Sequence, residues 1–87
     1  MPWVVEVLAA ALPEVEALPE DMREPYVKHL EGKLWEMRMT GRDGIARAIY
    51  IAATGRRVIV LRAFIKKTQK TPRSELEIAR RRAKEVS

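Results

Sequence analysis

Four basic side chains lie close together between residues 66 and 73. The apolar, β-branched run at 57–65 predicts a strand just before them, and residues 74–80 predict a helix just after them. A strand end, a cluster of cations and the N–H groups of a helix start therefore meet, which favours anion binding. We expect a polyanion at this place, and RNA is the polyanion that the pattern favours. The four cations are Lys66, Lys67, Lys70 and Arg73.

Two arginines extend this chemistry to the preceding predicted strands. Arg38 and Arg47 flank a turn at residues 40–44, so a hairpin can bring both side chains to one face of a sheet. RNA can be cleaved by its own 2′-hydroxyl, and the protein then assists proton transfer and stabilises the charge on the phosphorane. A guanidinium suits the second task because its fork matches two phosphate oxygens. The predicted catalytic residues are Arg38, Arg47, Lys66 and Lys67, and the predicted RNA-binding residues are Lys70, Arg73, Arg80, Arg81 and Arg82.

Each of these residues also has a simpler interpretation. Arg38 could belong to a solvated strand face, since charged residues are common on surfaces. Arg47 lies among apolar residues, so its burial would need a reason, and that favours a functional role. Trp35 and Tyr50 are expected in the core. Glu36 could act as a general base, but the sequence alone does not select it.

The composition limits the classes of site that the chain can form. Its 87 residues make one domain, in which 47% of the residues are hydrophobic. There is no cysteine and a single histidine, His29, which is expected in a loop; the sequence therefore predicts neither a disulfide nor a metal site, and no cofactor. No apolar run is long enough to cross a membrane and no signal pattern precedes the domain, so we expect a cytoplasmic protein without membrane contact.

Charge is distributed unevenly along the chain. Residues 1–55 contain six Lys/Arg and nine Asp/Glu, a net charge of −3, whereas residues 56–87 contain eleven and three, a net charge of +8. The simple interpretation is a solvated basic helix. A field of one sign in so short a stretch is, however, typical of a nucleic-acid surface.

The apolar periodicity predicts an α+β fold. A first strand is expected at 3–8, a helix at 13–22, and an antiparallel meander of strands at 33–39, 45–53 and 57–66, the last of them central and covered on both faces. Thr71 is placed to cap a final helix and Pro72 to open it. The prediction is a mostly antiparallel four-stranded sheet with one N-terminal helix and one basic C-terminal helix, whose apolar stripe is Leu76, Ala79, Ala83 and Val86.

Three ordered blocks of the chain resemble a known family. The block at 26–38 contains His29-Leu30-Glu31-Gly32 followed by Leu34-Trp35-Glu36-Met37-Arg38, the block at 45–50 has Arg47 followed by Tyr50, and the block at 64–72 has Phe64-Ile65-Lys66-Lys67-Thr68 and ends in Lys70-Thr71-Pro72. In this order they resemble the RelE/HigB toxin superfamily, in its phage-derived branch. The resemblance covers about residues 23–87 and implies a RelE-like fold, with residues 1–87 as a single toxin domain.

The resemblance implies the toxin of a type II toxin–antitoxin pair. Family members are small cytoplasmic endoribonucleases, many of which cleave ribosome-bound mRNA, and their usual partner is a small helix-turn-helix antitoxin. Arg38, Arg47 and the Lys66–Lys67 pair match the family's basic active-site strands, and Lys70 and Arg73 match its basic helix entry. We therefore expect a metal-independent endoribonuclease; the alternatives are a non-catalytic basic nucleic-acid-binding module, or an inactive toxin remnant that binds an antitoxin.

The N-terminal half departs from this family. The family places two helices between its first strand and the meander, whereas only one helix fits between Leu8 and Tyr26, as if the second were removed near Met22–Arg23. One face of the sheet should then lack a cover and leave apolar side chains open to water or to a partner. We expect lowered stability, or a homodimer that forms through this uncovered face.

Overall fold

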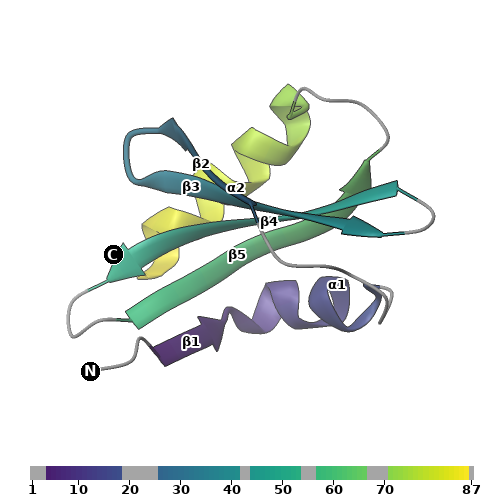
Figure 1. Cartoon of the computed structure of the whole chain (residues 1–87). Helices are drawn as coiled ribbons and strands as arrows, with labels where there is room; N and C mark the ends of the chain where they lie inside the picture. The colour runs from purple at the N-terminus through teal and green to yellow at the C-terminus, as the bar shows by residue number, and fades with distance from the viewer. Residues whose placement is uncertain (1–3, 19–25, 42–43, 54–56, 67–70, 87) are drawn as a thin grey trace.

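The computed structural model describes residues 4–18, 26–41, 44–53, 57–66 and 71–86, which form a five-stranded sheet and helices (Figure 1). The sheet order is β1-β5-β4-β3-β2, and only the β1–β5 pair is parallel. This confirms the α+β class and adds one strand, β2, to the four predicted. The elements are β1 (Val4–Val7), a 3₁₀ turn η1 (Ala9–Ala11), α1 (Leu12–Glu16), β2 (Tyr26–Glu31), β3 (Leu34–Gly41), β4 (Gly44–Ala53), β5 (Arg57–Lys66) and α2 (Arg73–Val86).

Glycines close the two hairpins that lead into and out of β3. Gly32 has a φ of +49° between β2 and β3, and the carbonyl oxygen of Gly32 lies 2.9 Å from Nε2 of His29. Gly44 has a φ of +145° and pairs with Gly41 at the end of the β3–β4 hairpin. Both φ values favour glycine, which has no Cβ to clash with the backbone. His29, expected in a loop, instead lies exposed on β2.

Helix α2 covers one face of the sheet and forms the core with it. The predicted stripe is confirmed: Ala79 is fully buried, and the other three stripe residues pack against the buried side chains of β3, β4 and β5. Figure 1 shows α2 crossing behind these strands. The buried core residues are Leu34, Ile49, Ile51, Ile59, Leu61 and Ala79.

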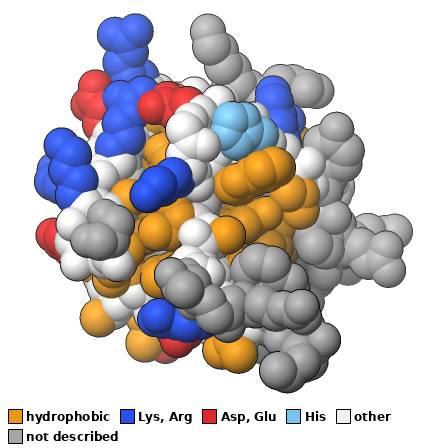
Figure 2. Space-filling model, turned by 90° about the vertical axis from the view of Figure 1, so that its left-hand side faces the viewer, with side chains coloured by type: hydrophobic (Ala, Val, Ile, Leu, Met, Phe, Trp, Pro, Cys, Tyr) orange, Lys and Arg blue, Asp and Glu red, His pale blue; other side chains and the backbone are white. Residues whose placement is uncertain are grey.

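The opposite face of the sheet carries exposed apolar side chains. Trp35 is 38% exposed and Ile65 is 43% exposed, and an apolar hollow of about 280 Å³ is lined by Trp35, Tyr50, Ala52 and Val58. Figure 2 shows hydrophobic side chains gathered beside the single histidine, whose ring meets that of Trp35 edge-on at a centroid distance of 4.8 Å. The prediction that Trp35 belongs to the core is wrong, because the helix that covers the sheet lies on the other face.

Strand β5 lies next to the edge strand β1, and β4 is the middle strand. Strand β5 therefore has a neighbour on each side, as predicted for a strand in the interior of the sheet. The expected cover is also present: η1 and α1 pack along β5 beyond the end of β1, as Figure 1 shows, while α2 lies on the core face. Val60 and Ala63 are buried on this strand together with Ile59 and Leu61, so consecutive residues must be apolar.

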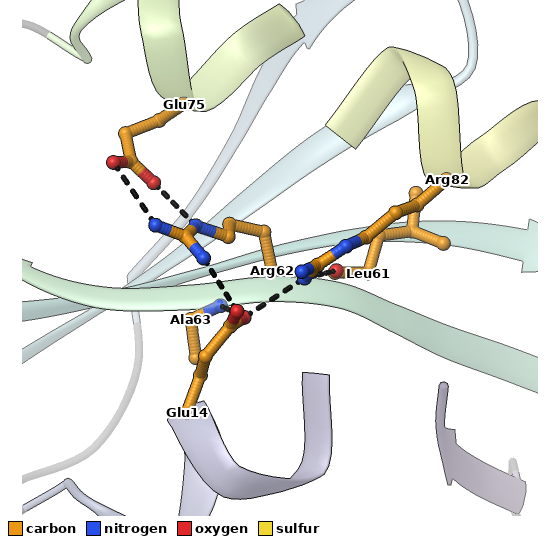
Figure 3. A network of polar contacts seen from close by, with 6 residues as sticks. All are labelled: Glu14, Leu61, Arg62, Ala63, Glu75 and Arg82. Carbon is orange, nitrogen blue, oxygen red and sulfur yellow. Dashed lines mark hydrogen bonds and ion pairs between the residues drawn. The ribbon is translucent and has the colours of Figure 1, made fainter. Parts of the chain in front are cut away.

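Side chains complete the hydrogen bonding of β5 where β1 ends. The Leu8 N–H donates to the Val60 carbonyl at 3.0 Å, one residue after the end of β1. Beyond it, the Arg82 guanidinium donates to the Leu61 carbonyl at 2.8 Å, and the Ala63 N–H donates to the Glu14 carboxylate at 3.3 Å (Figure 3). These two edge groups of β5 thus have partners without a longer β1.

Glu14 joins three elements through these contacts. Its carboxylate accepts hydrogen bonds from Arg62 on β5 and from Arg82 on α2, the latter at 3.0 Å, and Arg62 also binds Glu75 at 2.6 Å (Figure 3). Partial burial opposes the charge on Glu14, but the hydrogen bonds from Arg82 and Ala63 and the two guanidinium charges outweigh it and lower the pKa of Glu14. The carboxylate is therefore stabilised in its ionised form in the folded protein.

We predict that Glu14→Gln lowers the free energy of unfolding by about 2 kcal/mol at pH 7, since it weakens hydrogen bonds to charged groups. Because folding lowers the pKa of Glu14 below its ordinary value of 4.5, this stabilisation is present above that value and is lost as the pH falls through the folded-state pKa. Urea unfolding of wild type and variant should therefore differ at pH 7, and the difference should shrink as the pH falls below 4.5. Glu16→Gln, an exposed change on the same helix, is the control. Equal stabilities of wild type and Glu14→Gln at pH 7 would contradict the prediction.

Candidate functional site

The hairpin of β3 and β4 places the two predicted catalytic arginines opposite each other. Arg38 pairs with Arg47 in the register, and Arg47 pairs with Phe64 on β5. Lys66 pairs with Ile45, two positions further along the strands. Directly paired residues share a face of the sheet, so Arg38 and Arg47 both lie on the side covered by α2.

A buried carboxylate lies between these arginines. Glu36 is fully buried; its Oε1 accepts a hydrogen bond from Nε of Arg38 at 2.5 Å, and its Oε2 lies 3.9 Å from Nη1 of Arg47. The Thr71 hydroxyl donates to Oε2 of Glu36 and accepts from Nη1 of Arg47 at 3.2 Å. We call Glu36, Arg38, Arg47 and Thr71 the Glu36 cluster.

Burial sets the electrostatics of this cluster. Arg47 is fully buried, and this burial lowers its pKa; Glu36 works in the opposite direction, and Arg38 lowers the pKa of Arg47 further. The Arg38 side chain is 18% exposed, so its guanidinium lies between the buried carboxylate and the surface. A buried guanidinium is tolerated when a carboxylate and hydrogen-bond acceptors accompany it.

Thr71 has a different role from the one predicted. The Pro72 carbonyl accepts hydrogen bonds from the N–H groups of Glu75 at 3.1 Å and Leu76 at 3.3 Å, so the first turn of α2 is built on Pro72. The hydroxyl of Thr71 is bound in the Glu36 cluster rather than to the start of the helix. The prediction of a Thr71 cap is therefore corrected: this side chain joins the segment before α2 to β3 and β4.

The predicted RNA-binding arginines of α2 differ in their surroundings. Arg73 and Arg81 are exposed. Arg80 is exposed but binds both carboxylate oxygens of Glu31, at 2.7 and 2.6 Å. Arg82 turns inward to Glu14 and Leu61, so its predicted contact with RNA has no support in the fold. The side chain of Lys66, and Lys67 and Lys70 as a whole, lie outside the described residues.

Two members of the cluster were not among the predicted site residues. Glu36 stands two positions before Arg38 on an alternating strand, so their shared face could be read from the sequence. The burial of Glu36 between two arginines could not be predicted from the sequence, because it depends on α2 covering this face of the sheet. Thr71 gives no signal of its role, since the same residue type before a helix is typical of a cap.

A comparison with family models identifies the relatives of this chain. The model of the family described as phage derived protein Gp49-like (DUF891) matches residues 4–84. The chain belongs to this family. The match begins at β1 and ends near the last turn of α2, so it contains the whole Glu36 cluster. Among curated proteins, none matches significantly. In the described part of the chain, no helix combines the length and the apolar content that a membrane crossing requires.

We predict that Arg47→Ala lowers the free energy of unfolding by about 3 kcal/mol, because it empties the space of a fully buried side chain and removes one of the two guanidinium groups beside the Glu36 carboxylate. Replacing both partners, with Glu36→Leu and Arg47→Met together, should restore part of the loss. Urea unfolding followed by circular dichroism gives both values. If Arg47→Ala unfolds at the wild-type urea concentration, the ion pair contributes nothing and the prediction fails.

Proposed function

We propose that this Gp49-like protein is the toxin of a type II toxin–antitoxin pair and that it cleaves mRNA, in the context of the ribosome, without a metal ion. Membership of a family of toxin-like proteins supports a toxin role. The observation that carries the nuclease proposal is the pairing of Arg38 with Arg47 on adjacent strands, next to Thr71, which lies two residues before the basic helix α2. Arg38 and Arg47 carry two positive charges and Glu36 carries one negative charge, so the three side chains together have a net charge of about +1 that can attract a phosphate.

The proposed reaction is transesterification within the RNA. The 2′-oxygen attacks the adjacent phosphorus and loses its proton, the bond from phosphorus to the 5′-oxygen breaks, and the 5′-oxygen takes up a proton. Arg38, which reaches the surface, would bind the phosphate and the charge that develops on it, with Arg47 behind it. Lys66 and Lys67 would add positive charge, and Lys70, Arg73 and Arg81 would bind the RNA backbone.

A second function is favoured by one observation. Glu36 binds Arg38 and lies close to the fully buried Arg47, so an internal carboxylate already occupies the place of a phosphate. That arrangement suits a basic nucleic-acid-binding module without catalysis, or an inactive toxin remnant that binds a helix-turn-helix antitoxin. The exposed cations Arg73, Arg81 and Lys84 on α2 serve either function.

The nuclease proposal predicts that a short pulse of expression arrests growth and produces new 5′ ends in mRNA. Arg38→Ala should abolish the arrest and slow cleavage by about 10²- to 10³-fold, because it removes a group that stabilises the transition-state charge. Arg57→Ala is the matched control, since Arg57 is an exposed arginine at the far end of β5 that binds Glu6. Both variants are compared with wild type for soluble yield and melting temperature.

Three results would count against this proposal. Equal cleavage rates of wild type and Arg38→Ala would show that Arg38 does not take part in the reaction. A wild type that binds RNA without cutting it would favour the binding module. A wild type that binds an antitoxin but no RNA would favour the remnant.

The open sheet face leads to a prediction about assembly. Its exposed side chains include Val27, Trp35 and Ile65, and burying them against a second copy would remove apolar surface from water. We predict a dimer in sedimentation velocity that Trp35→Lys dissociates. Leu12→Lys, which changes an exposed leucine on α1, should leave it intact. A wild type that sediments as a monomer at high micromolar concentration would contradict this assembly.

A further inference from the structure

The geometry points to Glu36 as the positioning residue of the site, which holds Arg38 and the segment before α2 in one arrangement for the RNA phosphate. The inference rests on the proposed function, in which Arg38 contacts that phosphate. It assigns to Glu36 an action through Arg38 and Thr71, and no contact with RNA.

The first carboxylate oxygen of Glu36 fixes the direction of Arg38. Nε of Arg38, the guanidinium nitrogen nearest to the backbone, donates to Oε1 of Glu36 at 2.5 Å. Because the guanidinium is planar and rigid, a fixed Nε also fixes the plane in which its terminal nitrogens lie. Glu36 is fully buried and Arg38 partly exposed, so the hydrogen bond orients the group from the protein side.

The second oxygen fixes the chain before α2. Thr71 donates its hydroxyl to this oxygen and is 35 residues away from Glu36 in the sequence. Arg47 donates to the same hydroxyl at 3.2 Å, so Thr71 is bound from both β3 and β4. Thr71 stands two residues before Arg73, the first residue of α2, so its anchoring sets where this basic helix begins relative to Arg38.

The surroundings of Glu36 do not suit a group that exchanges protons with RNA. Its side chain has no exposed surface, and Arg38 and Thr71 each donate to one of its two oxygens. A general base must come within hydrogen-bond reach of the hydroxyl that it deprotonates. Positioning needs only the contacts that the structure contains.

Two variants with matched controls test the inference on the full-length protein. Thr71→Val removes one hydroxyl at constant shape, and its control Thr40→Val makes the same change at an exposed position of β3. Glu36→Gln removes the negative charge of the carboxylate, and its control Glu77→Gln does so at an exposed position of α2. We expect Thr71→Val and Glu36→Gln each to lower the cleavage rate at saturating RNA by about 10- to 100-fold, because small displacements of positioned groups cost that much. The controls should cut at the wild-type rate.

Two further readouts separate positioning from proton transfer. The pH dependence of the rate should keep its shape in Glu36→Gln, since the group that titrates is not removed. The double variant should be about as slow as the slower single variant, because both changes break one connected unit. Loss of one limb of the pH profile in Glu36→Gln would assign the proton transfer to Glu36 and overturn the inference, as would wild-type rates in both single variants.

Hydrogen exchange tests the anchoring without any cleavage. The amides of Glu75 and Leu76, which donate to Pro72, should exchange about 10-fold faster in Thr71→Val than in Thr40→Val, since the chain before α2 has lost its anchor. If the wild type cuts no RNA but exchange changes in this way, the proposed function fails while the anchoring through the Thr71 hydroxyl stands. Unchanged exchange in Thr71→Val would overturn the anchoring. This measurement does not depend on Glu36→Gln, so it tests the inference even if that variant does not fold.

Discussion

The register of one hairpin places two positive charges directly opposite each other, and the rest of the site follows from how that repulsion is balanced. Arg38 and Arg47 are cross-strand neighbours, an arrangement that destabilises a sheet when the charges are alike. The carboxylate of Glu36 lies beside both and offsets the repulsion. Since removing an ion from water is costly, all three groups need close partners, and Thr71 supplies a further one. The start of α2 is thereby tied to the centre of the sheet.

Much of the sheet could be predicted because its strands alternate, but the alternation does not tell which face is covered. Residues 33–39 and 45–53 form the expected hairpin, and the stripe of α2 packs as predicted. Strand β2 was missed, since its block has no clear alternation and its pairing depends on the turn at Gly32. Trp35 was assigned to the core because a large aromatic on an alternating strand is usually buried. It is exposed here because α2 lies on the opposite face.

The candidate site shows the same limit at the level of single residues. The sequence indicates that Arg38 and Arg47 can meet, because the turn between them is short. The apolar neighbours of Arg47 indicate its burial, but the sequence does not indicate that Arg47 binds Thr71 or that Arg82 turns inward, since both depend on contacts between residues more than twenty positions apart. Thr71 combines a local signal for capping with a long-range partner, and the long-range partner prevails. Tertiary contacts therefore decide which of the predicted cations can reach a ligand.

The uneven distribution of charge along the chain also produces ion pairs between the two halves of the domain. Carboxylates of the acidic half bind arginines of the basic half: Glu6 binds Arg57, Glu14 binds Arg62 and Arg82, and Glu31 binds Arg80. Part of the imbalance thus joins the two halves of the domain to each other. This reduces the charge that is available for nucleic acid, but it concentrates what remains: Arg73, Arg81 and Lys84 are exposed on α2, and Arg38 reaches the surface near the start of this helix. A basic helix that is held at both ends by internal ion pairs offers its exposed cations in a fixed arrangement, so a bound RNA would not have to order the helix.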